Sequence, residues 1–392
     1  MQLSTDRILT THAGSLPRAP ALTALLADRE NGRAVDEARL RTLAAEGIGE
    51  VVRRQAAAGI DVASDGEQPR TSYMTYVTHR MSGFGGESKR AAPRDLLDFP
   101  DYMERHRKIS AALSGGQTRI FNAPQAIGPV RYEDASAAAE ECAMFRAALD
   151  AERPPFAEAF MTAASPGVIS FGMANAHYPS HADYVMALAD AMRTEYELIH
   201  SAGFLLQLDC PDFANEYSKG FWDRPVSAYQ AILEVHVEAI NRAVTNIPRE
   251  AVRLHVCYGN YEGPHTRDIA LADILPIVCH AKVGALQIEF ANPRHQHELR
   301  TVREIGLPAN MALIPGVIDT TTNFVEHPEV VAERLLRAVE AVGDRERVLA
   351  GTDCGFSTFA GVENVARDVV WAKLAALAEG ARRASRTLWG RG

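Results

Sequence analysis

Apolar runs of strand length alternate along this chain with longer amphipathic segments, and this alternation limits its possible folds more than any other feature. Strand-length runs occur at Ile8–Thr11, Ile60–Ser64, Glu158–Thr162, Phe204–Asp209, Val252–Cys257, Ala285–Phe290, Met311–Pro315 and Val348–Thr352. Helical patterns between them include Asp36–Ala58, Ala182–Ala202, Val226–Val244, Pro328–Val342 and Val362–Glu379. Strands that alternate with helices in this way predict an α/β protein, a single (β/α)8 TIM barrel over residues 1–392.

One stretch, Gly83–Glu133, interrupts the alternation after the second strand. It contains a highly charged segment and a strand-like pair near Arg119–Tyr132. We interpret it as an insertion that forms a lid or an oligomer contact, with a solvated surface excursion as the alternative. The runner-up fold is an open doubly wound sheet, which is disfavoured because no Gly-rich phosphate loop follows the first strand.

The charge balance argues against two classes of partner. Lys and Arg number 41 and Asp and Glu number 50, so the formal net charge is −9. An acidic chain is a poor ligand for nucleic acid or for an anionic membrane surface. The sequence contains neither an apolar run long enough to span a bilayer nor a secretory signal, so we expect a cytoplasmic protein.

The five cysteines are odd in number and widely spaced, which is a poor disulfide framework. Cys142, Cys210 and Cys279 are interpreted as structural, with Cys210 bordering the pocket because it follows Asp209. The other two belong to a pattern of metal-binding residue types.

Four such residues stand at the ends of predicted strands. His255 and Cys257 are two residues apart, so their side chains share one face of the fifth strand. Glu289 ends the sixth strand and Cys354 follows the eighth, after Asp353. The carboxyl ends of barrel strands form the face where active sites lie, and two sulfurs, one imidazole and one carboxylate suit Zn²⁺. Each residue alone could instead be a core residue or a salt-bridge partner.

Seven motifs together resemble the cobalamin-independent methionine synthase family. They are TTHAGSLPR at Thr10–Arg18, SDGEQPR at Ser64–Arg70, QLDCPDFA at Gln207–Ala214, HVC at His255–Cys257, IEFAN at Ile288–Asn292, GVID at Gly316–Asp319 and GTDCGF at Gly351–Phe356. The resemblance implies a catalytic (β/α)8 barrel that holds zinc through His255, Cys257, Glu289 and Cys354. It also implies a homocysteine site at Gly14, Ser15, Glu67 and Asp209, in which a zinc-bound thiolate attacks an electrophilic carbon.

The chain departs from the family pattern in three places. Full-length members have two barrels, and this chain resembles only the catalytic one. Thr321 stands where the family has a proton-donating histidine, and Met173 stands near the position of the tryptophan that stacks on folate. The resemblance therefore does not extend to a methyltetrahydrofolate donor. His12 and His177 are the candidate replacements for proton transfer, although His12 could instead hydrogen-bond the Gly14–Ser15 backbone.

These observations define three functional hypotheses. The first is a zinc-dependent S-methyltransferase acting on a small, homocysteine-like thiol, with Asp209 and His12 as catalytic residues. The second is an epoxide:thiol alkyltransferase or lyase of the coenzyme M type, like a relative of the family, with Arg18 and Arg70 as candidate partners of a sulfonate. The third is a metal-binding protein without turnover. The expected partners are a thiol and a methyl or alkyl donor, and a corrinoid protein is left open.

Overall fold

Six parallel strands form one strongly curved sheet in a computed structural model that describes residues 1–88, 92–114 and 123–390. In sheet order they are β1 (Val62–Ser64), β4 (Glu158–Ala164), β5 (Leu205–Asp209), β6 (Val252–Val256), β7 (Ala285–Glu289) and β8 (Ala312–Gly316). Every residue of the last four strands is buried, as expected for a parallel sheet covered by helices. These strands lie within one to three residues of the positions predicted from the apolar runs.

The first and last predicted strands close this sheet into a barrel. Thr10 bridges Ala350 in parallel, the Val62 N–H donates to the Thr10 carbonyl at 2.9 Å, and the Leu349 N–H donates to Leu313 at 3.0 Å. The segments 8–11 and 348–352 therefore fill the gap between β8 and β1. The predicted (β/α)8 barrel with an insertion after its second strand is confirmed.

The segment near the N-terminus pairs only through isolated bridges because side chains take over part of its hydrogen bonding. The backbone N–H of Leu9 donates to the Ser4 hydroxyl at 3.0 Å, and that of Thr10 donates to the Asp61 carboxylate at 2.9 Å. Such side-chain acceptors replace a regular strand ladder. The irregular pairing of this segment is therefore determined by the nearby polar residues Ser4 and Asp61, and not by its apolar residues.

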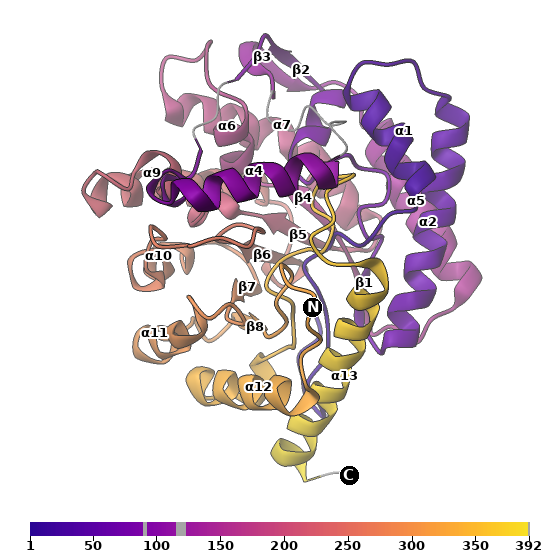
Figure 1. Ribbon diagram of the computed structural model, residues 1–392, viewed down its shortest axis with the longest axis vertical. Helices are drawn as coiled ribbons and strands as arrows, with labels where there is room; N and C mark the ends of the chain where they lie inside the picture. The colour runs from indigo at the N-terminus through magenta and orange to yellow at the C-terminus, as the bar shows by residue number, and fades with distance from the viewer. Residues whose placement is uncertain (89–91, 115–122, 391–392) are drawn as a thin grey trace.

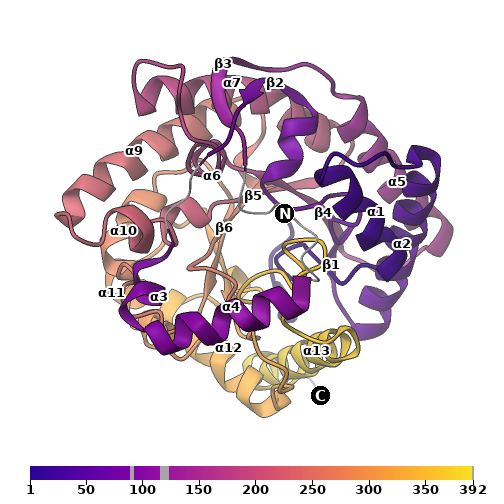
Figure 2. The same ribbon diagram turned by 45° about the horizontal axis from the view of Figure 1, so that its top comes forward.

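Helices surround the strands in chain order, as Figure 2 shows. The outer helices are α2 (Glu37–Ala58), α5 (Ser136–Glu152), α7 (His181–Ser201), α9 (Val226–Ala243), α10 (Leu271–Val278), α11 (Leu299–Ile305), α12 (Pro328–Val342) and α13 (Arg367–Trp389). Further helices are α1 (Pro20–Glu30), α6 (Pro166–Gly172) and α8 (Tyr217–Gly220). Short 3₁₀ segments lie at Thr75–His79, Pro211–Phe213, Arg249–Ala251, Gln296–Glu298 and Arg345–Arg347. Each long helix buries one apolar stripe against the sheet, and α12 does so with Val331, Ala332, Leu335 and Ala338.

The C-terminal helix extends beyond its predicted end. The sequence placed this end near Glu379, whereas α13 continues to Trp389. Ala381, Ala384 and Ser385 are buried at helical spacing, so the stripe of small residues continues through the arginine-rich segment after Glu379. None of the helices in the described part of the chain is both long and apolar enough to cross a membrane.

The insertion contains a hairpin and two helices. β2 (Met81–Gly85) pairs antiparallel with β3 (Gln125–Tyr132), and α3 (Arg94–Asp98) precedes α4 (Pro100–Ser114). The strand pair predicted near Arg119–Tyr132 was thus partly wrong, because the partner of β3 lies at the start of the insertion, while residues 115–122 lie outside the described ones. In Figures 1 and 2, α4 crosses in front of the strands.

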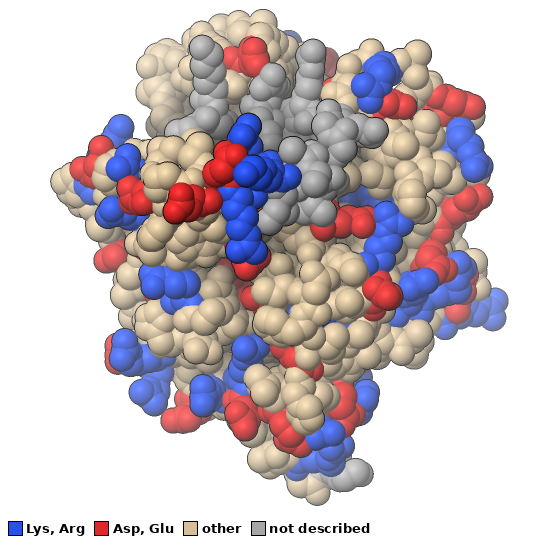
Figure 3. Space-filling model, in the orientation of Figure 1, with Lys and Arg blue, Asp and Glu red and all other residues tan. Residues whose placement is uncertain are grey.

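Two carboxylates of α3 fasten the insertion to the loop that follows β6. Asp95 is fully buried and accepts hydrogen bonds from the Tyr261 hydroxyl at 2.8 Å and the His265 N–H at 3.0 Å. Asp98 pairs with Arg267 at 2.8 Å. The insertion therefore packs at the carboxyl end of the barrel. In Figure 3, basic side chains gather over α4, while both signs of charge mix over the rest of the described face. Lys108 of α4 is exposed.

A buried network of two arginines and two glutamates joins the insertion to the barrel. Arg80, which precedes β2, pairs with Glu195 at 2.9 Å and also contacts Glu141, while Arg70 pairs with Glu141 at 2.9 Å. The Tyr76 ring lies between the two guanidinium groups, with centroid distances of 4.3 and 4.6 Å. The network ties the second βα loop to α5 and α7.

Replacing Arg80 with methionine is expected to lower the free energy of unfolding by about 3–5 kcal/mol, because it leaves the buried Glu195 carboxylate without its close cation. Urea denaturation would measure the loss. The matched control is Arg53→Met, which removes a half-exposed ion pair with Glu152 and should cost less than about 1 kcal/mol. Equal effects of the two substitutions would contradict a structural role for the buried network.

Candidate metal centre

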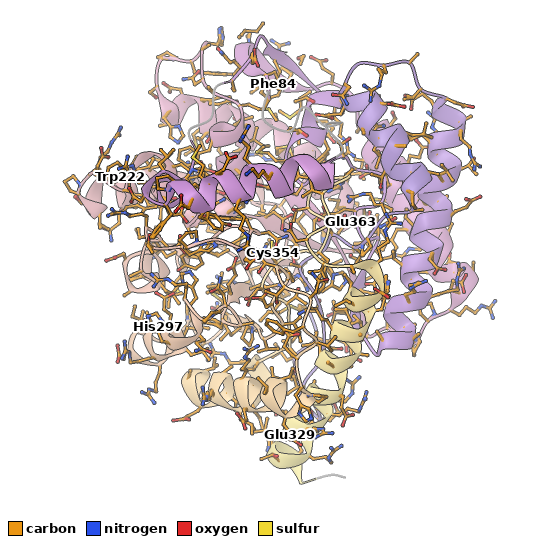
Figure 4. The ribbon with its side chains drawn as sticks, in the orientation of Figure 1. Phe84, Trp222, His297, Glu329, Cys354 and Glu363 are labelled. Atoms are coloured by element: carbon orange, nitrogen blue, oxygen red, sulfur yellow. The ribbon has the colours of Figure 1, made fainter. Side chains whose placement is uncertain are left out.

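Three of the four predicted metal ligands form one buried cluster. His255 lies in β6, Cys257 follows that strand, and Cys354 follows the segment that closes the barrel. One potential ligand atom from each residue lies within 4.8 Å of those of the other two, and the two sulfurs are 3.6 Å apart. Figure 4 places Cys354 near the centre of the molecule.

Glu289, the fourth predicted ligand, borders this cluster at the end of β7. Its Oε1 accepts a hydrogen bond from the Tyr258 N–H at 2.9 Å. Burial raises the pKa of Glu289 well above its usual value, and the neighbouring Cys257 thiol adds to this rise. The carboxylate therefore adjoins the three-residue cluster and is held by the loop that carries Cys257.

The cluster fits a metal ion better than it fits an ordinary core. Neither ring nitrogen of His255 has a hydrogen-bond partner among the described residues, although the ring is buried. Burial also lowers the pKa of His255 to about 3, which keeps it in the neutral form that ligates metals. The Gly259 N–H donates to the Cys257 sulfur at 3.2 Å, but the Cys354 thiol and burial together raise the pKa of Cys257 well above its usual value. Two sulfurs, an imidazole and a carboxylate are a donor set that suits Zn²⁺.

Asp353 holds the two sides of the cluster together. Its carboxylate accepts hydrogen bonds from the backbone N–H groups of Phe290, Ala291 and Asn292 at 2.8–3.0 Å. It thus fixes the residues after Glu289 against the turn that presents Cys354. This bridging role was not predicted, and only the position of Asp353 directly before a candidate ligand could have suggested it.

The Gly14–Ser15 turn lies between the cluster and Glu67. Gly14 has a φ of 127°, and a Cβ there would lie 2.5 Å from the Thr162 methyl carbon and 2.7 Å from Glu67 Oε1. On the other side, a Cβ at Gly355 would lie 2.1 Å from the Ser15 hydroxyl. Only glycine permits these two close approaches. The Gly14–Ser15 turn therefore lies directly against Glu67 on one side and against Gly355 on the other.

Glu67 and Asp209 form a buried, coupled pair of carboxyl groups. Burial raises the pKa of Glu67 to about 7, and Asp209 has a pKa well above its usual value because of burial and the nearby Glu67. Glu67 Oε1 accepts a hydrogen bond from the Thr162 hydroxyl at 3.0 Å, whereas its buried Oε2 has no partner among the described residues. An unpaired buried carboxylate oxygen is costly and is a natural site for a cationic group of a ligand.

His12 uses both ring nitrogens within the protein. Nδ1 lies 3.2 Å from the Gly14 N–H, which donates to it, and Nε2 lies 2.7 Å from Gln55 Oε1. Burial lowers the pKa of His12 to about 4. The geometry therefore supports the alternative in which His12 shapes the Gly14 turn, and we no longer include it among the groups proposed to transfer a proton.

The two arginines considered as sulfonate ligands also have protein partners. Arg18 donates to the carbonyl oxygens of Ser357 at 2.7 Å and Glu67 at 2.6 Å. Arg70 donates to the Thr162 carbonyl at 2.7 Å, besides its ion pair in the buried network. Both guanidinium groups hold the loops around the site, so the geometry does not support their proposed contact with a sulfonate.

The residues at the positions that depart from the family pattern do not replace the proton-donating histidine or the tryptophan that stacks on folate. The Thr321 hydroxyl donates to Asp319 at 2.9 Å, and the Met173 side chain is fully buried in the core. His177, the other candidate for proton transfer, is exposed in the loop after α6. A narrow pocket opens beside Cys354, and Asn260, Asn292, Thr320 and Thr321 contribute to its lining.

Buried sulfur, imidazole and carboxylate groups at the carboxyl ends of barrel strands are typical of barrel enzymes, in which this face carries the active site and such groups can bind a metal. Residues 8–92 and 167–376 match the family described as cobalamin-independent synthase, catalytic domain, and the chain belongs to this family.

Several known proteins are similar to this chain. A methionine synthase of Thermococcus kodakarensis is 26% identical over 347 residues, covering 88% of this chain and 86% of the relative. A 2-hydroxypropyl-CoM lyase of Xanthobacter autotrophicus is 24% identical over 371 residues, covering 86% and 84%. A B12-independent methionine synthase from a Shewanella species, solved in complex with selenomethionine, superposes with a TM-score of 0.73 at 21% identity over 98% of this chain and all of that one. The last likeness shows a shared fold.

Proposed function

We propose that this protein is a zinc-dependent S-methyltransferase that methylates a small thiol carrying an ammonium group, as homocysteine does. The observation that carries this proposal is the unpartnered Oε2 of buried Glu67, beside Asp209 and across the Gly14 turn from the cysteine cluster. A sulfur site and an ammonium site at opposite ends of one turn suit an amino acid thiol. The methionine synthases among the relatives support the same reading.

His255, Cys257, Glu289 and Cys354 would hold the zinc ion. Zinc supplies one chemical function there, since it lowers the pKa of a coordinating thiol until the sulfur is ionised at neutral pH. Asp353 keeps two of these ligands in place through its three backbone hydrogen bonds. The burial of all four ligands keeps bulk water away from the reacting sulfur.

Glu67 and Asp209 would bind and orient the ammonium end of the substrate. A cation beside them lowers the pKa of both carboxyl groups, so that both can be ionised together. In the reaction a carbon–sulfur bond forms as the bond between the methyl carbon and its donor breaks. The thiol proton is released, and the bonding electrons leave with the donor.

The first experiment is metal analysis of the purified protein, followed by X-ray absorption at the zinc edge with and without homocysteine. We expect about one zinc per chain and an additional sulfur neighbour when homocysteine is added. Transfer assays with several methyl donors should then yield methionine. The matched control is 4-mercaptobutyrate, which lacks the ammonium group and should bind weakly.

Three results would contradict the proposal. A purified protein that contains no zinc would contradict the proposed zinc-dependent reaction. Zinc whose sulfur neighbours do not change with homocysteine would exclude that thiol. Consumption of 2-mercaptoethanesulfonate with an epoxide, without any methyl donor, would favour the alkyltransferase that the lyase relative represents.

A further inference from the structure

Arg253 is a buried cation directly below the proposed substrate site. It lies in β6 two residues before His255, so both side chains point into the barrel. Its side chain is 1% exposed, and its hydrogen-bond partners among the described residues are all uncharged. A buried charge without an ion pair has a large desolvation cost, so its other contacts must offset that cost.

The guanidinium group instead makes three directed hydrogen bonds. It donates to Gln207 Oε1 at 2.7 Å, to the Thr11 hydroxyl at 3.0 Å and to the His12 carbonyl at 2.7 Å. It also lies over the Phe160 ring, 3.7 Å from the centroid. The flat fork of an arginine can satisfy several fixed acceptors at once, which the point charge of a lysine cannot do.

These bonds determine which way the Gln207 amide faces. Because its oxygen accepts from Arg253, its NH₂ group points to the other side. There it donates to Asp209 Oδ1 at 3.0 Å and to the Ala13 carbonyl at 2.6 Å. Without the guanidinium group the amide could turn and place its oxygen against the carboxylate. Arg253 thereby controls the donor that faces Asp209.

The same bonds hold the start of the Gly14–Ser15 turn. Arg253 holds the carbonyl of His12, and Gln207 holds the carbonyl of Ala13, which directly precedes Gly14. One guanidinium group therefore fixes both the carboxylate and the turn assigned to the amino acid end of the thiol.

We infer that Arg253 is a positioning residue for the ammonium-bearing end of the substrate, acting on Asp209 through Gln207 and on the Gly14–Ser15 turn through the His12 carbonyl. It contacts neither the substrate nor the reacting sulfur. The inference rests on the proposed function, since it assumes a thiol whose ammonium group reaches Asp209.

The test compares two thiols in wild-type, Arg253→Met and Arg253→Lys proteins. Homocysteine carries the ammonium group, and 4-mercaptobutyrate has the same chain without it. In Arg253→Met we expect a KM for homocysteine raised about 10- to 100-fold, the usual effect of losing a group that orients a ligand-binding residue. The KM for 4-mercaptobutyrate should rise much less, and the zinc content should not change. Arg253→Lys should restore little, because it keeps the charge without the fork.

Gln207→Met provides a second route if Arg253→Met does not fold. It removes the same link to Asp209 and should raise the KM for homocysteine selectively. Equal losses with both thiols, loss of zinc, or full activity in Arg253→Lys would overturn the inference while leaving the proposed function intact. A wild-type protein that binds homocysteine no better than 4-mercaptobutyrate would overturn the proposed function, and the inference with it.

Discussion

Cys257→Ser and Cys354→Ser proteins are expected to lose both bound zinc and methyl transfer while the barrel stays folded. A serine hydroxyl is a much poorer zinc ligand than a thiolate, and the two sulfurs stand 3.6 Å apart in one cluster. Metal assistance contributes several kcal/mol to such reactions, so activity should fall by about a thousandfold or more. Metal analysis and circular dichroism would measure the two effects separately.

Cys279→Ser is the matched control for these substitutions. Cys279 ends α10 on the outer helical layer and belongs to no metal cluster in the described part of the chain. The same chemical change there should leave zinc and activity intact. Full zinc content in both Cys257→Ser and Cys354→Ser would refute the assignment of these two residues as ligands.

The barrel and the clustering of the candidate ligands His255, Cys257 and Cys354 could be predicted because the informative residues are local in sequence. The strand runs are continuous, and His255, Cys257, Glu289 and Cys354 each follow or end such a run. In a parallel barrel all strand ends meet at one face, so position along each strand is enough to bring these side chains together.

The contacts of the charged residues could not be predicted in the same way, because their partners are distant in sequence. Arg18 bonds to the carbonyl of Ser357, which is 339 residues away, and Arg253 bonds to the carbonyl of His12, 241 residues away. Every residue has a backbone carbonyl, so the type of a residue does not show that its carbonyl accepts such a bond. Arg18 was therefore considered as a substrate ligand, and the position of Arg253 in the barrel interior emerged only from the structure.

Glu67→Gln and Asp209→Asn proteins are expected to bind homocysteine far more weakly than the wild-type protein. Removing one partner of a buried charge pair costs about 2–5 kcal/mol, which corresponds to a dissociation constant raised about 30- to several thousandfold. Both substitutions preserve the size of the side chain. Direct titration with homocysteine would measure the loss, and Glu234→Gln on the exposed face of α9 is the control that should show none.

The pH dependence of binding tests the same pair independently. The pKa of Glu67 is raised to about 7, so its carboxyl group gains a proton as the pH falls through that value. Because only the ionised form attracts an ammonium group, the affinity of the wild-type protein for homocysteine should fall below about pH 7. Glu67→Gln should lose this transition. In Asp209→Asn the transition should persist, because burial is the main cause of the raised pKa of Glu67. A transition near pH 7 that persists in Glu67→Gln and is absent from Asp209→Asn would assign it to Asp209 and contradict its assignment to Glu67.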